Sequence, residues 1–267
     1  MLRRPRRRRA SWYNGRSFPI ATAVCAVVIA SVALVSWLVF FRSGGGSEPP
    51  GPPAAAIVDQ LSFNVPNPDF VQQTTALLEQ AGYRVDYYPY EEVNVDFYRR
   101  LPERGYELII FRSHADRLQA EWHGEPIDEV ILFTSEPYDR SKYIQDQAAN
   151  RLVIAQYDLD GAEYFGIAPD FFNKAIGNFK GATVIMMGCE GLLSTRTAEA
   201  FVDLGAKEYI SWDEAVTAPH TDAATSALLQ HLLVEQHSAS DSVAQTMAEV
   251  GPDPVFGSRL KIYPPGD

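Results

Sequence analysis

The stretch TVIMMGCEG, residues 183–191, places four apolar residues before a Gly-Cys pair, an acid and a second glycine. A short apolar run that ends at a glycine is typical of a strand buried on both faces of a sheet. The stretch LIIFRSHA, residues 108–115, has the same form and ends near His114. These patterns predict a parallel sheet with helices on both faces, in which residues 183–191 form a central strand and the turn that carries Cys189.

The chain after residue 53 alternates between strand and helix patterns. We expect strands at residues 54–62, 83–90, 106–115, 183–190, 207–214 and 258–265, and helices at 67–82, 95–105, 168–179, 196–206, 221–236 and 241–251. The first helix has clear end signals, since Asn67 is a favoured N-cap and Gly82 a favoured terminator. Two further strand patterns, at 128–136 and 150–158, predict an inserted hairpin-like element. Its polar connection, 136–150, carries Arg140 and is a candidate processing loop.

The N-terminal segments have a different composition. Residues 1–17 contain seven arginines and no acid, and residues 18–41 are apolar or small without a charge. A helix of that length reaches about 36 Å, enough to cross a hydrocarbon core of about 30 Å. We therefore expect a basic cytoplasmic N-terminus at 1–17, a single transmembrane helix at 18–41, a Gly/Pro-rich linker at 42–56 and an extracytoplasmic α/β domain at 57–267.

Three other interpretations of the N-terminal segments are less favoured. A secretory signal usually has a shorter apolar region and a small-residue cleavage site. A buried core helix is rarely this long. Nucleic-acid binding by the arginines is disfavoured because the cluster directly abuts the apolar segment.

Charge and cysteine content limit the chemistry of the large domain. Eight of the 23 basic side chains lie in residues 1–42, so the remainder has 15 basic against 34 acidic side chains, a net charge of −19. Such a domain is not expected to bind nucleic acid or anionic lipid, and its acids either form a solvated surface or favour cationic substrates. Outside the apolar segment Cys189 is the only cysteine, so no disulfide can form within the domain.

Cys189 and His114 each follow a predicted strand, at the edge of the sheet where open α/β proteins bind ligands. A thiol and an imidazole are the minimum set for covalent acyl transfer, in which the thiolate attacks a carbonyl and the histidine protonates the leaving amine. Backbone N–H groups in the glycine-flanked turn are candidates for stabilising the oxyanion. The structural alternative is that Cys189 packs as a small hydrophobe and that His114 caps a loop.

Several motifs resemble the caspase-like superfamily of cysteine peptidases, in particular its CHAT, separase and gingipain branch. The matching pieces are LIIFRSHA at 108–115, GCEG at 188–191, LGA at 204–206, Trp212 and DAAT at 222–225. Their order agrees with that family over residues 57–235. The resemblance implies a three-layer sandwich with a mostly parallel caspase-like sheet, peptidase activity and a protein or peptide substrate.

Carried onto matching positions, the resemblance implies Cys189 as nucleophile and His114 as general acid/base, with an oxyanion hole formed by the amides of Cys189 and Ala115. The family usually has His-Gly, whereas this chain has His114-Ala115. A His-Gly pair occurs at His123-Gly124, so His123 is the alternative catalytic histidine.

The resemblance also points to recognition of a basic residue before the scissile bond. Asp213 and Asp222 are the candidate acids of that pocket, beside Trp212. The competing interpretation of Asp222 is a favourable acid in the first turn of a helix.

Other chemistry has little support. Glycine-rich phosphate loops, G-x-S-x-G elbows and zinc motifs are missing from the sequence, and His231 and His237 are six residues apart, a poor spacing for two ligands on one helix face. We expect no cofactor and no metal. A catalytically inactive caspase-like domain that binds or senses a partner at the cell surface is the alternative function, and a tethered solute-binding domain is the third.

Overall fold

The computed structural model of the chain describes residues 51–122, 125–156 and 161–266. The predicted basic N-terminus, membrane helix and most of the linker lie outside this part, as does His123. Within the described ranges, no helix has the length and apolar character needed to span a bilayer. Residues from Pro52 onward form one compact unit.

The core of this unit is a six-stranded sheet with the order β10-β9-β8-β3-β1-β2. Its strands are β1 (Ala54–Asp59), β2 (Arg84–Pro89), β3 (Leu108–Arg112), β8 (Thr183–Met186), β9 (Glu208–Trp212) and β10 (Leu260–Tyr263). The first five pair in parallel, and β10 joins the edge antiparallel to β9. The sheet is therefore mostly parallel, as predicted, with β8 and β3 as neighbours at its centre.

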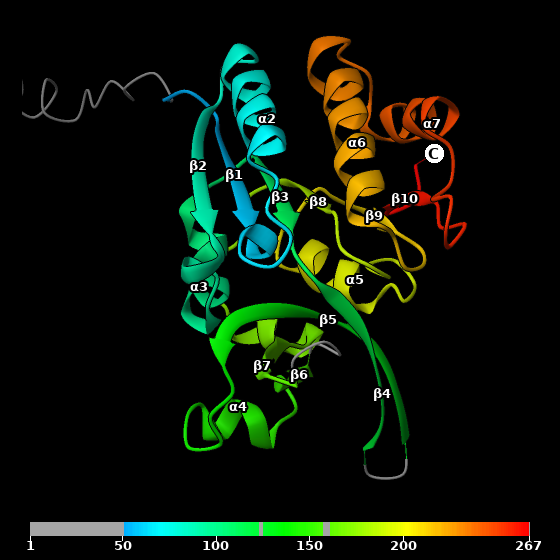
Figure 1. Cartoon of the computed structure of the whole chain (residues 1–267). Coiled ribbons are helices and arrows are strands. Elements are labelled where there is room, and N and C mark those ends of the chain that lie inside the picture. Colours follow the sequence, from blue (N-terminus) through cyan, green and yellow to red (C-terminus); the bar gives the residue numbers. More distant parts are fainter. Residues whose placement is uncertain (1–50, 123–124, 157–160, 267) are drawn as a thin grey trace, which may run out of the picture. The chain divides into compact units, whose positions relative to one another are not determined.

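Helices cover both faces of this sheet (Figure 1). One face packs on α2 (Pro68–Gln80), α6 (Ala218–Leu229) and α7 (Ala239–Glu249), and the other packs on α3 (Val95–Arg100) and α5 (Arg196–Asp203). Phe70 and Leu228 belong to the buried cluster on the first face, and Phe97 and Phe201 to the cluster on the second. The predicted N-cap of α2 is confirmed, because Asn67 Oδ1 accepts the Phe70 N–H at 3.1 Å.

The inserted element is larger than the predicted hairpin. It is a four-stranded antiparallel sheet with the order β4-β5-β7-β6, below the main sheet in Figure 1. Its elements are β4 (Ala115–Trp122), β5 (Glu125–Pro137), β6 (Leu152–Gln156), β7 (Glu163–Ile167) and the short helix α4 (Ile144–Ala148). β4 was not expected as a separate strand because half of its sequence, ADRLQAEW, is polar. β4 starts three residues after β3 ends and therefore joins the two sheets just beyond His114.

The predicted helix at 168–179 is wrong over half of its length. Only Pro169–Lys174 is helical, as a 3-10 segment. The reason is that Phe171, Phe172 and Phe179 are all buried, and Phe172 and Phe179 both pack against Phe201 of α5. Aromatic burial on α5 therefore determines the path of this segment.

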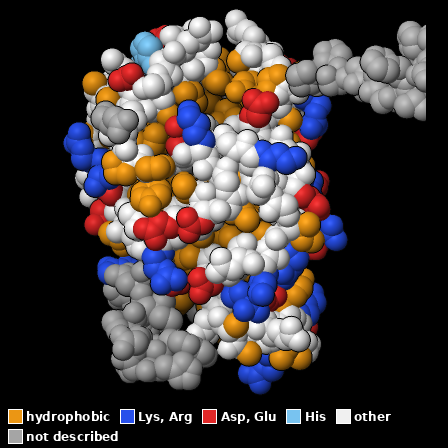
Figure 2. All heavy atoms as spheres, turned by 180° about the vertical axis from the view of Figure 1, so that it is seen from behind, with side chains coloured by type: hydrophobic (Ala, Val, Ile, Leu, Met, Phe, Trp, Pro, Cys, Tyr) orange, Lys and Arg blue, Asp and Glu red, His pale blue; other side chains and the backbone are white. Residues whose placement is uncertain are grey.

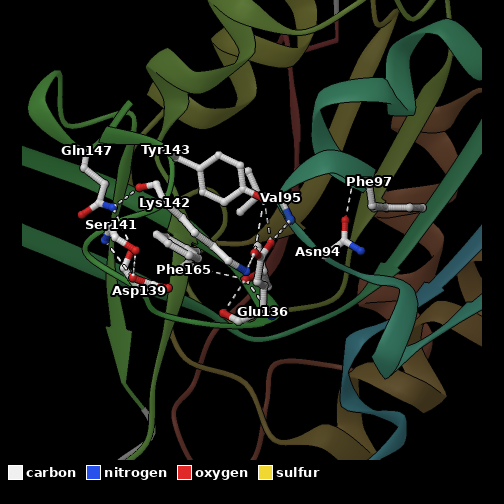
Figure 3. A network of polar contacts seen from close by, with 11 residues as sticks. Asn94, Val95, Phe97, Glu136, Asp139, Ser141, Lys142, Tyr143, Gln147 and Phe165 are labelled. Carbon is white, nitrogen blue, oxygen red and sulfur yellow. Dashed lines mark hydrogen bonds and ion pairs between the residues drawn. The ribbon is translucent and has the colours of Figure 1, made fainter. Parts of the chain in front are cut away.

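A polar network ties the end of β5 to the main domain (Figure 3). The Glu136 carboxylate accepts the Val95 N–H at the start of α3 at 3.2 Å, Lys142 Nζ at 2.9 Å and the Tyr143 hydroxyl at 3.2 Å. The candidate processing stretch 136–150 thus has an anchored beginning and contains α4, while Arg140 is exposed. Cleavage there stays a prediction.

The surface on the back of the molecule mixes both signs of charge. Acidic and basic side chains are interspersed with apolar ones across this face (Figure 2). The net negative charge of the large domain is therefore not gathered into a single acidic surface on this side.

Candidate active site

The carboxyl ends of β3 and β8 lie side by side, and His114 and Cys189 follow these two ends. The two strands pair in parallel, with Phe111 opposite Met186 as their last pair. His114 and Cys189 each follow three residues later, so parallel register places both just beyond the same edge of the sheet. Cys189 packs with the cluster on the α2/α6 face.

Gly188 provides the closest approach between these two segments. A Cβ at Gly188 would lie 2.4 Å from the carbonyl oxygen of Ser113 and 3.2 Å from the Ala115 nitrogen. Only glycine permits this backbone-to-backbone contact without displacement, because real Cβ atoms do not approach a carbonyl oxygen so closely. The turn before Cys189 therefore packs directly on the residues that flank His114, and the Ala115 N–H region faces that turn.

The thiol of Cys189 is half-buried and protonated in this arrangement. Burial raises the pKa of Cys189, although a hydrogen bond with the backbone of Val216 lowers it, and the charges of Glu190 and Asp116 raise it further. Sγ lies 3.6 Å from that Val216 oxygen. Glu190 adopts a left-handed backbone with φ of 61°, and its N–H donates to the carbonyl of Glu214 at 3.0 Å. A non-glycine residue at positive φ stores backbone strain, here next to the thiol.

The imidazole of His114 is neutral at physiological pH. Burial, followed by the charge of Arg112, lowers the pKa of His114 to about 4. Its backbone N–H donates to Gln60 Oε1 at 3.1 Å, and its ring lies 5.8 Å from the Phe133 ring, centroid to centroid. The free protein therefore holds a neutral thiol and a neutral imidazole rather than a thiolate–imidazolium pair.

The predicted pocket residue Trp212 lies in the core. It is 1% exposed, and its indole N–H donates to Thr221 Oγ1 at 2.9 Å. This placement leaves no surface on Trp212 for a substrate, so the structure assigns the side chain to packing between β9 and α6.

Asp222 and Asp213 already have cationic partners. Asp222 is 7% exposed and accepts two hydrogen bonds from Arg112, at 2.8 and 3.1 Å. Asp213 accepts the Arg259 N–H at 2.7 Å and pairs with Lys261 at 2.8 Å, which ties it to the β10 edge. Asp222 does line a hollow of about 290 Å³ between the first turns of α2 and α6, but neither Cys189 nor His114 contributes to that lining.

Two acids, Glu190 and Asp116, raise the pKa of the Cys189 thiol instead, and a third, Glu214, acts on Glu190. The pKa of Glu190 is raised by burial first, and then by the charges of Asp116 and Glu214. Asp116 and Glu214 are exposed. Their proximity follows from topology, because Asp116 comes two residues after His114 and Glu214 two residues after β9. The sequence signal for this cluster is the acid directly after Cys189.

Comparisons with known proteins give no sequence-level relative. The chain matches none of the protein-family models compared with it, and no curated protein matches it. Among solved structures it is similar to the Arg-specific cysteine proteinase gingipain R, at 13% identity and a TM-score of 0.40, over 73% of this chain and 42% of that one. It is also similar to protein GSU0716 from Geobacter sulfurreducens, at 9% identity and a TM-score of 0.38, over 80% of this chain and 95% of that one. The chain thus spans less than half of the gingipain chain.

Proposed function

We propose that the protein is a cysteine endopeptidase in which Cys189 is the nucleophile and His114 the general acid/base. The observation that carries this proposal is the close packing of Gly188 against Ser113 and Ala115. This contact brings together the two segments that carry Cys189 and His114.

The reaction begins from two neutral groups. As Cys189 Sγ attacks the substrate carbonyl carbon, its proton passes to His114, and the carbonyl oxygen becomes an oxyanion held by the amides of Cys189 and Ala115. The imidazolium then protonates the departing amine and leaves a thioester. Water attacks that thioester with His114 as base, which releases the acid product and restores the thiol.

A basic residue before the scissile bond is the substrate feature that fits the surroundings of the thiol. Glu190 and Asp116 place negative charge beside Cys189, which raises the pKa of the thiol, and Glu214 adds negative charge beside Glu190. This negative charge favours a cationic side chain. This cluster takes the role that the sequence had suggested for Asp213 and Asp222. We further propose that residues 18–41 anchor the protein in a membrane with the α/β domain outside the cytoplasm.

A second candidate function is a catalytically inactive domain that binds or senses a partner at the cell surface. It is favoured by one observation, the burial of the Cys189 thiol beside Glu190 and Asp116, which raises the pKa of the thiol and keeps the proton on sulfur in the free protein. In that case the same acids would recognise a basic segment of the partner without cleaving it.

A library of peptides with varied residues tests the proposal on the full-length protein. We expect cleavage after Lys or Arg, loss of cleavage in Cys189→Ser, and weaker preference for basic residues in Glu190→Gln. Glu79→Gln, an exposed acid on α2, is the matched control and should leave the preference unchanged. Binding of basic peptides without any cleavage would support the second candidate, and cleavage that persists in Cys189→Ser would contradict the nucleophile.

A further inference from the structure

A second group of metal-binding side chains lies at the far end of α6, remote from Cys189. His231, Glu235 and His237 each offer one ligand atom, and these atoms all lie within 4.8 Å of one another. The group sits where α6 ends before α7, in the orange region of Figure 1. The proposed peptidase reaction uses none of these side chains.

An irregular helix end brings the two histidines together. Residues six apart on an α-helix point about 120° away from each other, which is why the sequence spacing argued against a shared site. Here α6 continues as a π-helix, Gln230–Val234, and Gln236 then takes a left-handed backbone with φ of 57°. The chain folds back so that the His237 N–H donates to the His231 carbonyl at 3.1 Å, and the two rings stack at 6.0 Å. π-helical turns occur frequently at functional sites.

The spacing of the ligand atoms suits a small divalent transition metal. Tetrahedral Zn²⁺ with bonds of about 2.0–2.1 Å separates its ligand atoms by about 3.4 Å. Glu235 Oε2 lies 3.0 Å from His231 Nδ1 and 3.7 Å from His237 Nδ1. Both distances bracket the tetrahedral value. The remaining pair, the two histidine nitrogens, lies within 4.8 Å.

Two further features prepare the histidines for a metal. Glu249 Oε2 lies 3.1 Å from His231 Nε2 and, by accepting its N–H, leaves the lone pair on Nδ1 free for a metal. Carboxylates in this position commonly orient metal-bound histidines. His237 Nδ1 is buried and has no hydrogen-bond partner among the described residues. A buried nitrogen without a partner is costly unless something binds it.

We propose that His231, Glu235 and His237 bind a divalent transition metal of the zinc class, with Glu249 orienting His231 and a water in the fourth position. Carboxylate and imidazole ligands suit Zn²⁺ better than Ca²⁺ or Mg²⁺, which prefer oxygen alone. The metal then links the end of α6 to the turn that leads into α7.

Titration with Co²⁺, followed by displacement with Zn²⁺, tests this proposal. The titration uses full-length protein with the substitution Cys189→Ser, so that the thiol cannot bind the metal. This variant is the parent of the other variants below. We expect one equivalent of Co²⁺ to give the visible absorption of a tetrahedral site, and Zn²⁺ to remove it. His237→Ala should abolish the band, and Glu249→Gln, which keeps every ligand, should weaken Zn²⁺ binding by about 10- to 100-fold.

Two comparisons separate metal binding from a fault in folding. Thermal unfolding in a chelator should be the same for His237→Ala and its parent, whereas added Zn²⁺ should raise the melting temperature of the parent alone. Glu79→Gln should leave both titrations unchanged. Absence of the Co²⁺ band in the parent, or an unchanged band in His237→Ala, would overturn the proposal and leave only an ion-pair cluster.

Discussion

Replacing Asp222 by Asn separates a structural role of this acid from a role in a substrate pocket. Arg112 has a side chain that is 0% exposed, and it lies between Asp222 at 2.8 Å and Asp59 at 3.0 Å. Asn67 Nδ2 also donates to Asp222, at 2.8 Å, so the carboxylate joins α6 to both β3 and the first turn of α2. Asn retains the shape of Asp but removes its charge.

The size of the effect follows from the burial of Arg112. Breaking a buried ion pair by removing one partner costs about 3–5 kcal/mol, because a charge is left uncompensated in a medium of low dielectric constant. Asp59 still pairs with Arg112, so we expect the lower end, about 3 kcal/mol. For a domain of this size that loss lowers the melting temperature by about 6–12 °C.

Urea unfolding of the wild type, Asp222→Asn and Asp203→Asn measures this difference. Asp203 is exposed at the end of α5, and its replacement should change the unfolding free energy by less than about 0.5 kcal/mol. A loss below about 1 kcal/mol in Asp222→Asn, accompanied by a changed preference among peptide substrates, would refute the ion-pair account and restore Asp222 to the substrate pocket.

Three further predictions concern the turn at the thiol, the start of α6 and the pH dependence of labelling. Gly188→Ala should destabilise the domain by about 1–3 kcal/mol, since the added methyl overlaps the Ser113 carbonyl, and denaturant unfolding measures this loss. Burial raises the pKa of Asp253, but four hydrogen bonds, led by the Thr217 N–H, lower it to about 2. Its carboxylate therefore contributes about 2 kcal/mol above pH 4 that is lost as the pH falls through 2, so Asp253→Asn and wild type should converge in stability near pH 2. Because the pKa of Cys189 is raised, alkylation of its thiol should accelerate through pH 9 without a plateau, and a plateau near neutral pH would contradict the neutral pair.

Local sequence patterns were sufficient for the main sheet. Apolar runs identified the strands that end near His114 and Cys189, and the Asn67 cap located the start of α2. The second sheet was harder to predict, because half of the residues of β4 are polar and the strand pairs with β5 along its whole length.

Long-range partners explain the remaining differences at the candidate site. Asp222 has the residue type of a pocket acid, but its role is decided by Arg112, which is 110 positions away in the sequence. The spacing of His231 and His237 argued against a shared site only under the assumption of a regular α-helix, and the π-helical turn removes that assumption. Neither the Arg112–Asp222 ion pair nor the approach of His237 to His231 can be predicted from the neighbouring sequence.

The most direct test of the account is the rate at which Cys189 is acylated by a peptidyl electrophile that ends in arginine, compared between wild type and His114→Ala. Iodoacetamide serves as the reference reagent, because it needs a thiolate but no acid catalyst. We predict that His114→Ala slows the peptidyl reagent by about 100-fold or more, in line with loss of a general acid/base, and changes the iodoacetamide rate by much less. Equal rates with the peptidyl reagent, or an equal loss with both reagents, would contradict a catalytic Cys189–His114 pair.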